Sequence, residues 1–125
     1  MRETSTAQIG LRNDGILSVH IRRGAHQSLA DAEENLATAL AGTAGVRRPL
    51  LVNVAGAQPL DAEVRHHYSG RKLVDGFLAF ALVVDASPLG RMMGNVYFLV
   101  ARPGIPSRLF SDEPEAVTWL KGFLS

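Results

Sequence analysis

The chain contains no cysteine. This absence excludes disulfides, thiol nucleophiles and thiolate metal sites, and it fits a reducing compartment. A long apolar run is also missing, because the longest one, from Phe77 to Val84, is far shorter than the roughly 18 residues that a membrane span requires. The N-terminus, Met1 to Thr6, is polar and precedes no apolar segment, so it does not read as a secretory signal. We therefore expect a cytoplasmic protein.

An excess of charge of one sign is missing as well. The sequence has 13 Lys and Arg residues against 12 Asp and Glu residues, which gives a net charge of +1. Nucleic-acid-binding domains usually carry a stronger basic excess on one face, so we expect no nucleic-acid partner. The glycines form neither a phosphate loop nor a dinucleotide-binding fingerprint, and we expect no cofactor.

The length of 125 residues is close to the commonest size of a single domain. A chain of this length can bury roughly two thirds of its unfolded surface, which is enough for a stable core. Repeats, linkers and low-complexity segments are absent from the sequence. We expect one domain over residues 1–125, with about residues 1–6 disordered.

Patterns in the first half predict a hairpin and a helix. Alternating apolar residues over Gln8–Ile21 flank the dipeptide Asp14-Gly15, which favours a tight hairpin turn. Helical spacing of apolar residues over Ser28–Ala41 predicts a helix, with Ser28 as the N-cap and Asp31 in a capping box.

The remaining segments alternate between strand and helix patterns. Strands are expected where short apolar runs are bounded by turn residues, and helices where the apolar spacing is three or four. The expected elements are a strand over Pro49–Val54, a helix from about Leu60 to Lys72, a central strand over Phe77–Val84, a helix opened by Ser87-Pro88 and running to about Ala101, a strand over Ser107–Phe110, and a last helix capped by Ser111 or Asp112.

This order predicts the α/β class. Alternating units after a hairpin imply a mixed, mostly parallel sheet, because each helix crosses over between parallel strands. We expect four to five strands and about four helices.

At this level of detail the chain resembles the STAS domain, the fold of anti-sigma-factor antagonists and of the cytoplasmic tails of sulfate transporters. More narrowly, it is similar to small bacterial STAS/SEC14-like domains of unknown function. The segments that carry the resemblance are Asp14-Gly15-Ile16-Leu17, Pro49 to Val54, Ala81 to Asp85, Ser87 to Arg91 with Gly94-Asn95, and Arg108 to Glu113.

The resemblance implies helices mainly on one face of the sheet and a regulatory or ligand-sensing role rather than catalysis. In the antagonist proteins a serine after the third strand is phosphorylated. The corresponding segment here, Ala57 to Glu63, contains no serine or threonine, so the phosphorylation switch does not carry over.

Candidate polar sites are few. A cluster of Arg65, Arg71 and Lys72 could contact an anion, although a solvated helix flank also explains it. Adjacent His66 and His67 point about 100° apart on a helix and do not predict a metal site. Neither Ser87 nor the acidic residues at the start of the first helix have the partners that catalysis requires, so we expect no enzyme.

The third expected helix, which is opened by Ser87-Pro88 and runs to about Ala101, is apolar around almost its whole circumference, whereas a surface helix normally keeps a polar face. Another subunit, an apolar ligand, a membrane surface or the rest of the monomer could cover it, and we favour a homodimer interface. The residues that we assign to this surface are Leu89, Met92, Met93, Val96, Tyr97 and Val100.

The sequence thus predicts a non-catalytic regulatory or protein-interaction domain that self-associates, with an unidentified protein partner left open. The alternative is a carrier or sensor of a small apolar ligand such as a lipid.

Overall fold

The computed structural model describes residues 1–68, 71–92, 95 and 104–124. Its centre is a single six-stranded sheet in the order β1-β2-β3-β4-β5-β6. The strands are β1 (Arg2–Glu3), β2 (Ala7–Leu11), β3 (Leu17–Ile21), β4 (Arg48–Asn53), β5 (Phe77–Val83) and β6 (Ser107–Phe110). The first three strands pair antiparallel, and β3 to β6 pair parallel. The predicted α/β class and mixed sheet that opens with a hairpin are confirmed.

The sheet has six strands rather than the four to five that the sequence predicted. The additional strand is β1, in which Arg2 pairs with Ile9 and Glu3 with Gln8. It lies within residues 1–6, for which we expected disorder. Thr4 shows why this segment is ordered, because its side chain is buried and hydrogen-bonds the first helix through Asn35. Contacts distant in sequence therefore fix the N-terminus.

Four helices have complete bounds: α1 (Leu29–Ala41), α2 (Ala62–Tyr68), α3 (Arg71–Gly76) and α5 (Glu113–Lys121). The single helix predicted from Leu60 to Lys72 is wrong, since this region contains the whole of α2 and the first residues of a separate α3. Ser69 and Gly70, which lie between them in the sequence, are outside the described residues.

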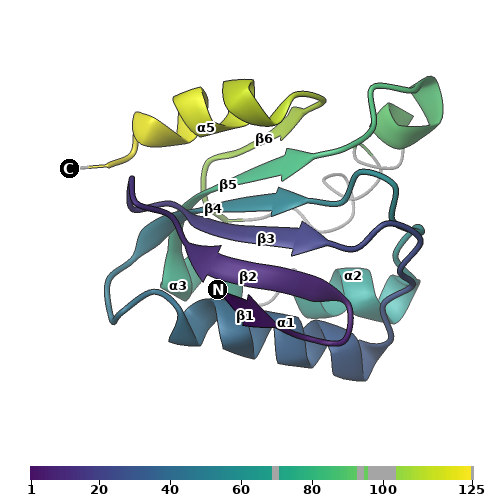
Figure 1. The fold of residues 1–125 in the computed structure, drawn as a ribbon, viewed down its shortest axis with the longest axis horizontal. Coiled ribbons are helices and arrows are strands. Elements are labelled where there is room, and N and C mark those ends of the chain that lie inside the picture. The colour runs from purple at the N-terminus through teal and green to yellow at the C-terminus, as the bar shows by residue number, and fades with distance from the viewer. Residues whose placement is uncertain (69–70, 93–94, 96–103, 125) are drawn as a thin grey trace.

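The helices cover the sheet unequally. Figure 1 shows α1, α2 and α3 on one face and α5 on the other. Alternate residues of each strand divide between the two faces, so that Leu50 belongs to the core under α1 and Leu51 to the core under α5. Burial on both faces explains why the middle of β4 and the whole of β5 are apolar.

The predicted helix starts at Ser28 and Ser87 are both confirmed. Ser28 Oγ accepts the amide of Asp31, and the Asp31 carboxylate accepts the amide of Ser28, which completes a capping box. Ser87 Oγ accepts the amide of Gly90 at 3.1 Å, and residues 88–92 are helical. Within the described ranges, no helix combines the length and the apolar character needed to cross a bilayer.

Candidate functional site

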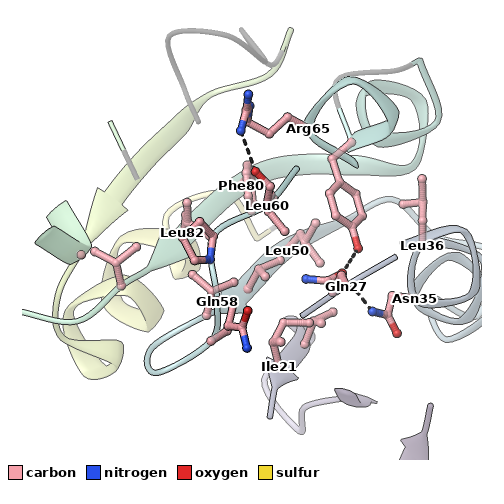
Figure 2. Close-up of a pocket in the computed structure, with 18 of the residues that line it drawn as sticks. Ile21, Gln27, Asn35, Leu36, Leu50, Gln58, Leu60, Arg65, Phe80 and Leu82 are labelled. Atoms are coloured by element: carbon pink, nitrogen blue, oxygen red, sulfur yellow. Dashed lines mark hydrogen bonds between the residues drawn. The ribbon is translucent and has the colours of Figure 1, made fainter. Parts of the chain in front are cut away.

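A cavity of about 220 Å³ lies between the sheet and the helices α1 and α2. The β3, β4 and β5 strands form its floor with aliphatic and aromatic side chains, and the segment after β4 closes one side (Figure 2). Ala39 of α1 lines the cavity with only a methyl group, and this small side chain leaves empty volume between α1 and the sheet. The apolar lining residues are Val19, Ile21, Leu36, Ala39, Leu50, Val52, Val54, Ala57, Pro59, Leu60, Leu73, Phe80, Leu82, Val84 and Met92.

Three polar side chains form a buried network in the wall of this cavity. Tyr68 donates its hydroxyl hydrogen to Gln27 Oε1 at 2.5 Å, and Asn35 Nδ2 donates to the same oxygen at 3.2 Å (Figure 2). Asn35 also donates to Thr6 at 2.9 Å and accepts from Thr4 at 2.5 Å, so both hydrogens and the oxygen of its amide are engaged. Burial raises the pKa of Tyr68 to about 12, and its hydroxyl therefore stays neutral as a donor.

This network determines which end of Gln27 faces the cavity. Both neighbours donate to its Oε1, so the oxygen must point at Tyr68 and Asn35. Figure 2 shows the Gln27 amide nitrogen turned away from these two residues, toward the cavity. Gln27 is only 4% exposed, and its nitrogen donates no hydrogen bond within the described part of the chain.

Arg65 on α2 contributes a positive charge to the cavity wall. Its Nη1 donates to the carbonyl oxygen of Leu60 at 2.6 Å (Figure 2). Its Nε is buried and has no hydrogen-bond partner. A buried donor left unpaired costs about 1–3 kcal/mol, and more for a charged group. Arg65 also forms no ion pair with any residue that the structure describes.

Two further polar side chains lie in the wall near the ends of the parallel strands. Asp85, which follows β5, accepts the amide of Gly56 at 3.0 Å. Gln58 donates through Nε2 to the carbonyl of Gly24 at 3.2 Å. Open α/β sheets commonly bind ligands at the carboxyl ends of their strands, and this cavity lies beside that edge.

A second polar cluster occupies the opposite face of the sheet. His20 from β3 and Asn53 from β4 both contact Glu113 Oε1, at 2.7 and 3.2 Å. Partial burial acts to raise the pKa of Glu113, but the hydrogen bonds from Asn53 and His20 outweigh it and lower the pKa. Among the described residues, no group of three His, Asp or Glu side chains converges to hold a metal ion.

The residues that the sequence grouped as an anion contact come from two helices, Arg65 from α2 and Arg71 and Lys72 from α3. Arg65 is half-buried in the cavity wall, whereas Lys72 on α3 is exposed. The side chain of Arg71 lies outside the described residues. Arg65 therefore borders the cavity, and the anion contact of the three residues stays a prediction.

The predicted interface surface is described only in part. Leu89 is 60% exposed and Met92 is 56% exposed, and Met92 also borders the cavity. The other four residues that we assigned to this surface lie outside the described part of the chain. They are Met93, Val96, Tyr97 and Val100.

Sequence reasoning missed the polar network of the cavity. Asn35 carried a usable signal, because it occupies the buried stripe of α1 together with Ala32, Leu36 and Ala39. A polar residue on such a stripe requires hydrogen-bond partners from elsewhere in the fold. Gln27 and Tyr68 are among those partners in space, but no local pattern connected them to Asn35.

Comparisons with known proteins support the fold and leave the activity open. The family model described as "Domain of unknown function (DUF7793)" matches residues 9–124. A similar solved structure is an uncharacterized protein of the DUF3478 family with a SpoIIAA-like fold, from Shewanella loihica PV-4. It is 17% identical, with a TM-score of 0.63, over 96% of this chain and 98% of that chain. The predicted STAS-like fold is thereby confirmed.

A second solved structure is a protein of unknown function from Arthrobacter sp. FB24. It is 28% identical over 90% of this chain and 97% of that chain, with a TM-score of 0.35. No functionally curated protein matches the chain.

Proposed function

For this chain, which belongs to the DUF7793 family of domains of unknown function, we propose a non-catalytic regulatory role in which a small apolar ligand occupies the cavity between the sheet and α1. One observation carries the proposal, namely a cavity of about 220 Å³ walled mainly by aliphatic side chains. Empty space of this kind destabilises a core, and apolar cavities stay dry and accept apolar molecules. A ligand in the cavity would supply the van der Waals contacts that the lining side chains lack.

The volume of the cavity limits the size of the ligand. An engineered apolar cavity of roughly 150 Å³ holds benzene, and sites for drug-sized molecules run from about 300 to 1,000 Å³. The present volume of about 220 Å³ lies between these values. We therefore infer a ligand of about ten heavy atoms.

The titratable groups of the wall favour binding over catalysis. The raised pKa of Tyr68, about 12, keeps its hydroxyl protonated, and that hydroxyl already donates to Gln27. The Arg65 guanidinium offers hydrogen-bond donors and no acceptor, so it does not serve as a base. The Asp85 carboxylate holds the amide of Gly56. This set can orient a ligand, and it offers no nucleophile paired with a base.

The first experiment is native mass spectrometry of the freshly purified protein. A mass above an integer multiple of the chain mass, lost on denaturation, is expected if a ligand is bound. The variant Ala39→Leu fills part of the cavity and should abolish the added mass. The matched control is Ala37→Leu on the exposed side of the same helix, which should keep it. A ligand-free wild-type protein that also binds no apolar probe would contradict the proposal.

Self-association is a second candidate function, which we favoured from the sequence. Leu89 and Met92 are more than half exposed, and such apolar side chains at the start of the helix after β5 suit contact with a second copy or with another protein. The same mass spectra test this candidate, since an integer multiple of two or more indicates an oligomer.

A further inference from the structure

We propose that the ligand of this cavity is an uncharged carbonyl compound, such as a small ketone or ester, whose oxygen accepts a hydrogen bond from Gln27 Nε2. The inference rests on the proposed function, because it names the chemical class of ligand for the same cavity. It follows from a nearly buried donor in a mainly aliphatic wall, for which the described residues supply no acceptor.

The buried network holds the Gln27 side chain in one orientation. Its Oε1 accepts from Tyr68 at 2.5 Å and from Asn35 at 3.2 Å, and its Nε2 is turned toward the cavity (Figure 2). Gln27 is 4% exposed, so bulk water has little access to this nitrogen. Buried N–H groups are almost always paired in native proteins, and an acceptor on the ligand would supply the partner that the described part of the chain does not.

Other polar side chains of the described lining already have partners in the protein. The Tyr68 hydroxyl donates to Gln27, and the Asn35 amide is engaged on both hydrogens and on its oxygen. Gln58 and Asp85 each form a hydrogen bond with a backbone group. Gln27 Nε2 is therefore a point at which the wall offers a free donor to a ligand.

A carbonyl oxygen suits this donor better than a hydroxyl group or an anion does. A hydroxyl group also brings a hydrogen, and the oxygen of the same Gln27 amide already receives two. An anion in an aliphatic cavity is costly unless a cation pairs with it. Figure 2 shows Arg65 on another side of the cavity, with Leu60 and Phe80 between it and Gln27. A neutral carbonyl compound avoids both costs.

Two probes of the same shape isolate the effect of the carbonyl oxygen. Acetophenone has a C=O group where α-methylstyrene has C=CH2, and both are close to the size inferred for the ligand. Isothermal titration calorimetry at pH 7.5 gives the ratio of their dissociation constants for wild type and for Gln27→Met, which keeps the side-chain length and removes the N–H donor. In Gln27→Met the ratio should shift about 2- to 10-fold against acetophenone, as expected for the loss of one hydrogen bond.

Two controls accompany this comparison. The matched variant is Gln58→Met, because the Gln58 nitrogen already donates to the carbonyl of Gly24, and the ratio should stay as in wild type. Benzoate, a charged compound of similar size, should bind wild-type protein more weakly than acetophenone. Tighter binding of benzoate would mean that the cavity selects an anion, and the proposal would be wrong.

The outcomes separate this inference from the proposed function. An unchanged ratio in folded Gln27→Met would overturn the carbonyl assignment and leave an apolar-ligand cavity standing. Failure of both neutral probes to bind wild-type protein would overturn both. If circular dichroism shows that Gln27→Met does not fold, NMR spectra of nitrogen-15-labelled wild type decide the question. Acetophenone should move the Gln27 Nε2 hydrogens to lower field and α-methylstyrene should not, and equal shifts with the two probes would overturn the assignment.

Discussion

His20 Nε2 lies 2.7 Å from Glu113 Oε1, and this contact joins two residues that are 93 positions apart. It links the end of β3 to the first turn of α5, on the face of the sheet opposite to the cavity. Asn53 donates to the same oxygen from β4, so one carboxylate connects two strands to a helix start. A carboxylate in the first turn also interacts favourably with the helix dipole.

The lowered pKa of Glu113 makes this cluster sensitive to acid. A carboxylate whose pKa is lower in the folded state contributes stability above its unfolded value, near 4.5, and loses it as the pH falls through the folded value. Wild-type protein should lose up to about 1 kcal/mol more than Glu113→Gln between pH 6 and pH 3, since the group is partly solvated. Urea unfolding across this range measures the difference. The control is Glu115→Gln, which changes an exposed carboxylate of the same helix. If the free energy of unfolding depends on pH equally in wild type and Glu113→Gln, Glu113 does not have a lowered pKa in the folded state.

Replacing Asn35 by leucine should destabilise the fold strongly. The substitution leaves partners of the amide, among them Thr4, Thr6 and Gln27, with unpaired polar atoms inside the protein. The expected loss is about 2–4 kcal/mol in the free energy of unfolding. Chemical denaturation measures it, with Glu33→Ala on the exposed face of α1 expected within about 0.5 kcal/mol of wild type. A loss below 1 kcal/mol would show that water satisfies these groups.

The capping box at Ser28 predicts a smaller, local effect. Ser28→Ala removes the oxygen that accepts the Asp31 amide and should cost about 1 kcal/mol. Ser28→Thr should cost much less, because threonine also caps helices. Thermal unfolding monitored by circular dichroism would rank the two variants, and an equal loss in both would mean that the hydroxyl group does not contribute.

Met92→Asp tests the apolar surface at the start of the helix after β5. If two copies meet there, a buried carboxylate without a partner should shift the protein from an oligomer to a monomer at micromolar concentration. Size-exclusion chromatography with light scattering reads out the mass. Glu115→Lys on α5, far along the chain, controls for a change of surface charge, and an unchanged oligomer mass in folded Met92→Asp would exclude this surface.

Binding of a small apolar probe such as 1-octanol in the cavity should stabilise the wild-type fold. A ligand that binds only the native state adds RT ln(1 + [L]/Kd), or about 2.7 kcal/mol at a hundredfold excess over Kd. Thermal shift measurements with 1-octanol should show a rise in Tm for wild type and a smaller rise for Ala39→Leu, whose cavity is partly filled. Equal shifts in the two proteins would place the binding elsewhere.

Local patterns in the sequence were sufficient for most of the framework. Alternation identified β2 and β3, apolar runs identified β4 and β5, and the Ser28 and Ser87 caps marked helix starts, because each of these signals depends on neighbours within a few residues. The order of the elements then limited the topology to a hairpin followed by parallel crossovers. The strand β1 and the division of the second predicted helix into α2 and α3 were not predicted from the sequence, and a contact distant in sequence, from Thr4 to Asn35, holds the segment of β1.

The candidate site was a matter of tertiary structure. Gln27, Asn35 and Tyr68 come from a loop and two helices, and only the packing of α1 and α2 on the sheet makes one network of them. The same packing turns Arg65 from one of several basic residues on a helix into a half-buried cation in an apolar wall. The sequence by itself determined which segments are strands and helices and which faces they bury, because those choices follow from short-range periodicity. The cavity exists because the side chains of the sheet and of the helices above it do not fill the space between them. Its position and its polar lining depend on side-chain volumes that come together only in the folded chain.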